Sequence, residues 1–429
     1  MKKLGFGLFV LLLILGSVLY FTKPIKQTKS TTLQPLKHAV NLWVKQMQEN
    51  GFEIVDRVQS GEDDHFIFTF KHPDQIALYL QQKGLHTKAK EILPFEGLQI
   101  NADILYHSGT ISIALHPLNV PKYFRTSSLT QSQLAKLEQM IKQHVFSAHI
   151  DINYDQETFT GKLEDINTSL EDKPQIQIEV KKVHFGGTYQ KGVIIEHHES
   201  SQIFHVDIDS LFSRNIQEFT NHYNRTGKSE YDYTTTYSAS NITTSEGIQG
   251  ELEAQNVDFS TISSLTHEIK TESVEGTIAN VAIHSKQNKL TIQEFKLAMR
   301  SSKPINRLNQ DASEELTAED THIDISNLSV DGVEIAGSAL PGFVLHANLD
   351  VAPSLSIHTL IEQPKKSSEK IDGMIHLSIE KPLLEYLKKD PERILFYMMY
   401  RPKREAEQRI YDIDVDHGSL TINGKPVEF

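Results

Sequence analysis

Hydrophobic residues recur at every second position in many short stretches of this chain, and this pattern constrains the fold more than any other feature. One stretch carries Ile176, Ile178 and Val180, and another carries Ile375 and Leu377. Because successive side chains of a β-strand point to opposite faces, this alternation indicates strands with one buried face and one solvated face. Strands of this kind belong to antiparallel sheets. We therefore expect a large antiparallel β body.

Turn-forming residues separate many of these stretches. Examples are His107-Ser108-Gly109, Gly186-Gly187, Asp331-Gly332 and Asn423-Gly424, each placed where one alternating run stops and the next begins. The order of runs and turns is that of a meander and not that of strand–helix–strand units. The sequence predicts a mainly β fold with helices (α+β), arranged as an antiparallel meander or sandwich-like body.

A few amphipathic helices are expected to cover this body. Helical spacing of apolar residues predicts helices near 35–50, 73–83 and 130–144, and a pair of short helices at 382–400 precedes a terminal hairpin. The helix-pair faces are strongly apolar. We expect them to pack on the sheet, and contact with a lipid or partner is the alternative.

Residues 4–21 form an uncharged, mostly apolar run behind Lys2 and Lys3. At 1.5 Å per residue a helix over this run is about 27 Å long, which just spans a hydrocarbon core. We predict a single-pass transmembrane signal anchor at 1–22. A cleaved signal peptide is the alternative, but the run offers no small-residue cleavage site. The lysines before and after this run are similar in number, so the charge rule does not decide which end faces the cytoplasm. We expect the bulk of the chain to lie outside the cytoplasm.

The remaining chain divides by composition. A polar stalk at 23–32 leads into a β-rich exterior region at 33–300. Residues 301–320 lack apolar periodicity and are expected to form a polar linker or loop. A C-terminal β region follows at 321–429.

Composition excludes several classes of protein. The chain has no cysteine, so it has no disulfide, thiolate metal site or thiol nucleophile. Its 56 acidic residues exceed its 43 basic residues, which gives a formal net charge of −13. Because such a surface repels nucleic acid and anionic lipid headgroups, we expect no nucleic-acid partner and expect any contact with lipid to be apolar.

Short His-x-Asp pairs recur on predicted strands, and both side chains of each pair lie on one strand face. Three such strands side by side could supply ligands for a metal ion, but the polar outer face of a one-sided sheet produces the same pattern, and we prefer that interpretation. The pairs are His149 with Asp151, His205 with Asp207, and His322 with Asp324. Asp412, Asp414 and Asp416 are similar to the start of a calcium loop, but the glycine and the final glutamate of such a loop are misplaced.

No catalytic signature is present. The sequence contains no nucleophile elbow, zinc-binding helix motif, phosphate loop or dinucleotide fingerprint. Tyr231, Tyr233 and Tyr237 are expected on an edge strand and not on a base-stacking platform. We assign no catalytic, cofactor-binding or metal-binding residue, expect no cofactor, and favour a protein that is not an enzyme.

Three short segments resemble the YdgA-like family of bacterial envelope proteins. They are the terminal strand at 418–426, the strand-turn-strand that runs from Tyr106 to Leu118, and Phe185-Gly186-Gly187. The resemblance implies a bacterial inner-membrane anchor with a periplasmic body. The family has no assigned chemistry, so it carries no site residues to this chain.

The sequence therefore predicts a non-catalytic, membrane-anchored envelope protein of unknown molecular function. We expect it to contact the membrane through residues 4–21 and to receive lipid or another apolar ligand on a β-sheet face. A scaffold that binds an envelope protein through sheet edges is the alternative. A hydrolase with an unrecognised site is a third possibility.

Overall fold

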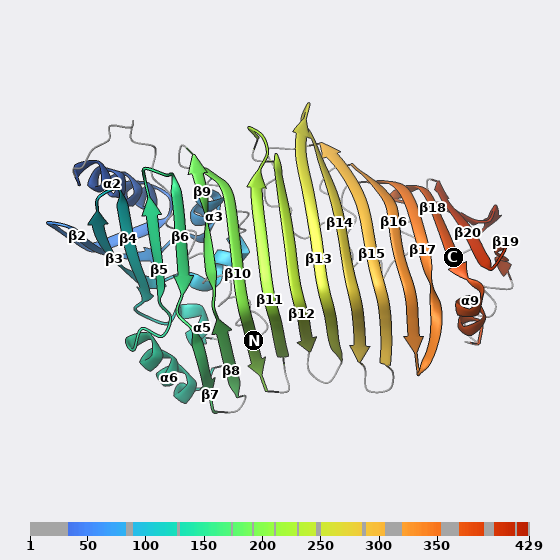
Figure 1. Cartoon of the computed structure of the whole chain (residues 1–429), viewed down its shortest axis with the longest axis horizontal. Helices are drawn as coiled ribbons and strands as arrows, with labels where there is room; N and C mark the ends of the chain where they lie inside the picture. Colours follow the sequence, from blue (N-terminus) through green and yellow to red (C-terminus); the bar gives the residue numbers. More distant parts are fainter. Residues whose placement is uncertain are drawn as a thin grey trace. The chain divides into compact units, whose positions relative to one another are not determined.

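A computed structural model gives the fold of most of the chain (Figure 1). It describes residues 33–82, 89–126, 129–172, 175–190, 193–209, 212–229, 231–245, 250–284, 289–304, 320–352, 369–389, 399–416 and 418–427.

The chain forms two compact units. Unit 1 comprises Met1–Arg225 with Ile242–Ile248, and unit 2 comprises Thr226–Asn241 with Gln249–Phe429. Described residues on both sides of 301–320, where we expected a linker, belong to unit 2. The middle of that segment, 305–319, lies outside the described residues.

Unit 1 is an antiparallel sheet covered by helices. Pairing runs from β1 through β6 in chain order, then from β6 to β9, β10 and β11, while β7 pairs with β8 and β8 with β10. The strands are β1 (Phe52–Ser60), β2 (Asp63–Phe70), β3 (Gln99–His107), β4 (Thr110–Pro117), β5 (Ala148–Asn153), β6 (Thr158–Leu163), β7 (Ile166–Leu170), β8 (Ile176–Lys181), β9 (His184–Gln190), β10 (Val193–Ile208) and β11 (Phe212–Arg225).

Helices close the core of unit 1. Trp43 of the first described helix packs edge-on against Phe66 of β2, with ring centroids 5.6 Å apart, and both side chains are buried. Thr130 and Gln133 form a capping box that fixes the start of another helix. The helices are α2 (Gln34–Glu49), α3 (Pro73–Gln82), α4 (Ala89–Ile92), the 3-10 turn η1 (Leu93–Phe95), α5 (Lys122–Thr126) and α6 (Gln131–Lys142).

The membrane-spanning part of the fold prediction requires correction. Among the described helices none is both long and apolar enough to cross a bilayer. The longest, α2, has 16 residues and carries Lys37 and Lys45 on its polar face. The predicted anchor at 4–21 lies outside the described residues. The transmembrane helix, the single-pass inner-membrane localisation and the periplasmic placement are therefore not supported.

Unit 2 is a meander of long strands. From β13 to β18 each strand pairs with the next, and β18 pairs with β20, which also pairs with β19 and β21 (Figure 1). The elements are β12 (Tyr233–Ser245, with its first part in unit 2), β13 (Glu251–Thr266), β14 (Ile269–His284), β15 (Lys289–Pro304), β16 (Thr321–Ile335), β17 (Ser338–Val351), β18 (Ile371–Glu380), α9 (Lys381–Leu387), β19 (Lys403–Glu405), β20 (Gln408–Asp416), β21 (Ser419–Ile422) and β22 (Lys425–Pro426).

Two further expectations differ from the structure. The described strands of each unit are hydrogen-bonded side by side within one sheet, not divided between two facing sheets. The sandwich-like part of the fold prediction is therefore wrong. Gly186-Gly187 and Asp331-Gly332 lie inside β9 and β16 and form no turns. A Cβ at Gly187 would lie 1.9 Å from the Glu196 carbonyl oxygen, so this glycine permits close strand approach.

Candidate functional site

Seven strands of unit 2 place apolar residues directly opposite one another. Such cross-strand partners share one sheet face, so a chain of partners forms a row across the sheet. The central row is Phe259, Gly276, Leu297, Leu328, Leu345, Leu377 and Tyr411, from β13 through β18 to β20.

Two further rows flank the central one, and we call the three together the apolar face. The first flanking row is Val257, Ile278, Phe295, Val330, Phe343 and Ile379. The second is Val274, Met299, Ile325, Ala347, Ile375 and Ile413. With about 4.8 Å between strands and about 7 Å between rows, the face measures roughly 30 by 14 Å.

The apolar face is only half-buried over much of its width. Leu297, Leu328 and Leu345 each keep part of their side-chain surface accessible. In the core of unit 1, by contrast, Phe66 and Phe68 are 0% exposed. The closed core of unit 1 therefore differs from the partly open face of unit 2.

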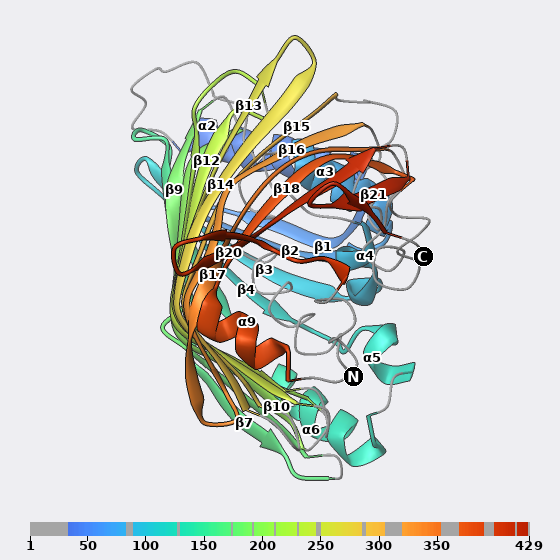
Figure 2. The same ribbon diagram turned by 90° about the vertical axis from the view of Figure 1, so that its right-hand side faces the viewer.

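Helix α9 covers one end of the apolar face. Leu383 and Leu384 of this helix are buried in a cluster with Ile379 and Tyr411, and α9 contacts β17, β18 and β20. Figure 2 shows that the strands of unit 2 are bent and that α9 lies on the inner side of the bend. The apolar face is thus the inner side of the bend.

The expected packing of the first C-terminal helix on the sheet is confirmed. Residues 390–398, which make up most of the second predicted helix, lie outside the described residues.

Gly276 leaves room on the apolar face for the ring of its cross-strand partner Phe259. A Cβ at Gly276 would lie 2.1 Å from the Phe259 ring, so this ring lies over the glycine backbone. The opposite face of the same strands is polar. There Lys296 forms ion pairs with Glu294 at 2.9 Å and with Asp331 at 3.1 Å, all of them solvent-exposed.

The His-x-Asp residues do not assemble a metal centre. Within the described ranges no group of three or more histidine, aspartate or glutamate side chains could hold a metal ion. Two of the histidines have a carboxylate partner on a neighbouring segment instead: His149 lies 3.5 Å from Glu164, and His322 lies 2.8 Å from Asp350. The alternation of burial along β5 is that of an outward polar face.

Asp412 of β20 contacts side chains of neighbouring strands. Asp412 accepts hydrogen bonds from Lys403 and from His376, the latter at 2.8 Å. These two contacts, with Lys403 the stronger, lower the pKa of the Asp412 carboxyl. The carboxylate is engaged by neighbouring strands, which is the arrangement of a solvated sheet face and not of a calcium loop.

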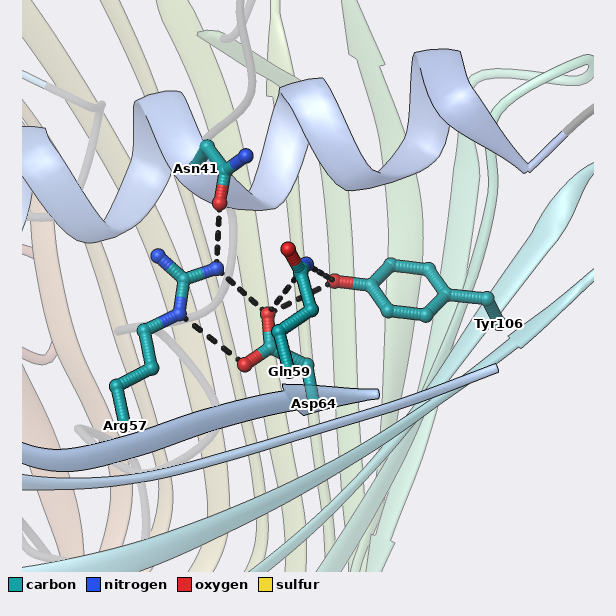
Figure 3. A network of polar contacts seen from close by, with 5 residues as sticks. All are labelled: Asn41, Arg57, Gln59, Asp64 and Tyr106. Carbon is teal, nitrogen blue, oxygen red and sulfur yellow. Dashed lines mark hydrogen bonds and ion pairs between the residues drawn. The ribbon is translucent and has the colours of Figure 1, made fainter. Parts of the chain in front are cut away.

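A polar network centred on the buried Asp64 of unit 1 was not expected from the sequence (Figure 3). Arg57 donates to both Asp64 carboxylate oxygens, at 3.1 and 2.6 Å, and also to Asn41 of α2. Gln59 and the Tyr106 hydroxyl donate to the same carboxylate, each at 3.0 Å. Burial, followed by the Asp64 charge and hydrogen bond, raises the pKa of Tyr106.

This network ties α2 to strands β1, β2 and β3. Asp64 is 1% exposed, and its carboxylate already accepts four hydrogen bonds. It offers little capacity to a ligand, so we interpret the network as structural. The sequence did contain one indication of this network. Asp64 is spaced by two from Phe66, Phe68 and Phe70, so its carboxylate points to the buried face, where it requires a polar partner.

No protein family, curated protein or solved structure matches this chain. The resemblance to the YdgA-like family therefore stays a prediction.

Proposed function

We propose that unit 2 binds the acyl chains of a lipid on the apolar face and that the protein acts without catalysis. One observation carries the proposal. Apolar rows cross the sheet, the central one from β13 to β20 and the flanking ones from β13 to β18 and from β14 to β20, and most of their side chains between β13 and β17 are only half-buried.

The size of the face favours a ligand-binding role. Its footprint, including the end under α9, is roughly 400 Å², which is within the range of the largest apolar patch on a typical monomer, and such patches are often functional. Fully covering one leucine or isoleucine side chain contributes about 1.5–3 kcal/mol, so covering several half-buried ones gives a substantial driving force. Part of this gain is offset by the entropy lost when the ligand is ordered.

Its shape favours a hydrocarbon chain over a second copy of the protein. The face lies on the inner side of bent strands (Figure 2), so two such faces would meet at their rims and leave a gap between them. A flexible chain can follow the curve. An acyl chain spans half of a hydrocarbon core, about 15 Å. The width of the face, about 30 Å, accommodates such a chain along the rows.

Two adjacent residues of β14 provide a matched test. Ile278 belongs to the apolar face, whereas the exposed Thr277 points to the opposite face. Calorimetric titration of the full chain with dioctanoyl phosphatidylcholine below its micellar concentration measures the dissociation constant. We expect Ile278→Glu to weaken binding about tenfold or more, because one desolvated charge costs at least about 1.4 kcal/mol. Thr277→Glu should bind like the wild type.

Circular dichroism of both variants controls for folding. The proposal is wrong if the wild-type chain binds no lipid. It is equally wrong if the two folded variants lose the same affinity, because binding would then not depend on the apolar face.

A further inference from the structure

Polar side chains replace the apolar rows toward one end of strands β13 to β15. The next row on the same face is Ser263, Glu272 and Ser301, and the row after it is Leu265, Lys270 and Lys303. These residues keep the strand parity of Phe259, Val274 and Met299, so they adjoin the apolar face directly. We call Ser263, Lys270, Glu272 and Lys303 the polar corner.

Two lysines face each other in the polar corner. Lys270 and Lys303 are directly opposite partners on β14 and β15. Like charges at such positions destabilise a sheet unless an anion lies beside them. The Lys270 ammonium lies 2.7 Å from Glu272 and over the Tyr231 ring, 5.8 Å from its centroid. Its side chain is therefore held in place against the corner.

The carboxylates near the lysines are already engaged. Burial alone would raise the pKa of Glu272, but Lys270, the Tyr233 hydroxyl and the charge of Lys303 outweigh burial and lower it. Tyr233 donates to Glu272 at 3.0 Å. Asp232 accepts from the backbone N–H groups of Leu265 at 2.9 Å and Ser229 at 3.0 Å. Lys270 makes the direct ion pair with Glu272, and Lys303 acts on this carboxylate through its charge.

A buried hydroxyl lies beside these charges. Ser263 is 1% exposed, and its Oγ has no hydrogen-bond partner among the described residues. It stands directly opposite Glu272 and on the same face. Buried hydroxyls normally have partners, so this one is suited to a polar group that enters the corner from the apolar face.

We propose that the polar corner binds the anionic headgroup of a phospholipid whose acyl chains lie on the apolar face. Lys303 and Lys270 supply the positive charge, and Ser263 supplies a hydroxyl donor. This inference rests on the proposed function and adds the class of lipid to it.

Two lipids that differ only in headgroup test the inference. The full chain is titrated with dioctanoyl phosphatidylglycerol, which is anionic, and with dioctanoyl phosphatidylcholine, which is zwitterionic. We expect the wild type to bind the anionic lipid about tenfold more tightly, as one charge-assisted hydrogen bond provides. The preference should fall as salt is added.

Two lysines of β15 provide matched variants, because Lys303 lies in the polar corner and Lys296 points to the opposite face. Lys303→Gln should abolish the preference for phosphatidylglycerol over phosphatidylcholine. Lys296→Gln should keep the preference. Equal loss in both variants would overturn the inference, since it would indicate a general charge effect.

The remaining outcomes separate this inference from the proposed function. Equal wild-type affinity for both lipids would overturn the headgroup site and leave the apolar face as a lipid site. Absence of binding to either lipid would overturn both. Binding of inorganic phosphate alone as tightly as the anionic lipid, lost in Lys303→Gln, would identify a free-anion site and overturn the lipid assignment.

Discussion

Asp64 shows how a single residue can hold a helix on a sheet. Its carboxylate is buried and accepts hydrogen bonds from Arg57, Gln59 and Tyr106, while Arg57 also reaches Asn41 of α2 (Figure 3). Removing one partner of a buried ion pair leaves the other charge desolvated, which costs about 3–5 kcal/mol. The network therefore contributes to stability chiefly because its members satisfy one another.

We expect Asp64→Asn to lower the free energy of unfolding of unit 1 by about 3 kcal/mol. Tyr106→Phe removes one hydrogen bond and should cost about 1 kcal/mol. The neighbouring Asp63 is exposed, so Asp63→Asn should change stability by less than about 0.5 kcal/mol. Urea unfolding followed by Trp43 fluorescence measures all three. If Asp64→Asn lowered the free energy of unfolding as little as Asp63→Asn, the structural role of Asp64 would be contradicted.

Two stacked histidines are expected to make unit 1 less stable in acid. The rings of His116 and His144 are stacked, with centroids 3.8 Å apart. Burial, followed by repulsion from His144, lowers the pKa of His116. The charge of Asp103 raises the pKa of His116, and repulsion from His65 lowers it. The unfolded chain therefore takes up this proton at a higher pH than the folded chain does.

By linkage, stability falls as the pH drops below the ordinary histidine pKa of about 6.5, because the unfolded state binds more protons there. We expect the urea midpoint of unit 1 to decrease between pH 7 and pH 5.5 and His116→Gln to reduce that decrease. His107, which is exposed, provides the control variant His107→Gln. An unchanged pH profile in the His116 variant would rule out this contribution.

At the scale of elements, local patterns predicted helices well. Leu36, Val40 and Trp43 recur at helical spacing, and α2 buries all three. Such spacing is a property of one segment, so the sequence contains it in full. Glycines were harder to interpret. Gly187 lies in a strand because the neighbouring backbone leaves no space for a Cβ, and this requirement depends on a partner strand that local sequence does not identify.

The long strands of unit 2 were less visible because their alternation shifts partway along. In β13 the apolar positions pass from Ala254 to Val257, and the intervening Asn256 has a φ of +49°. In β15 they pass from Ile292 to Phe295, and Glu294 has a φ of +46°. A left-handed residue inside a strand acts like a bulge and changes which face the next side chain takes. Period-two analysis therefore divides one strand into two short runs.

The candidate site was predictable only in part for the same reason. Alternation identified Ile375 and Leu377 as one face of a strand, and it motivated an apolar sheet face as a ligand site. The rows themselves depend on register, for example on Leu345 standing opposite Leu328 and Leu377. Register is fixed by tertiary pairing, and so is the meeting of Lys270 with Lys303.

At the scale of the whole molecule, the two units differ in how completely they bury their apolar surface. Unit 1 contains the large closed cluster around Trp43 and Phe66, whereas unit 2 has a small cluster under α9 and the half-buried apolar face. Stability rises with the apolar area removed from water. Unit 2 should therefore be the less stable unit in the absence of ligand, and the two units should unfold separately.

The single tryptophan makes this expectation measurable. Trp43 lies in unit 1, so its fluorescence reports that unit alone, while far-ultraviolet circular dichroism reports both. We expect an early urea transition seen only by circular dichroism and a later one seen by both probes. A ligand at one hundred times its dissociation constant adds about 2.7 kcal/mol to the state that binds it. Dioctanoyl phosphatidylglycerol should thus move the early transition to higher urea and leave the Trp43 transition in place. Coincident transitions would show one cooperative unit, and a lipid-induced shift of the Trp43 transition would place the binding site in unit 1, because linkage stabilises only the unit that holds the ligand.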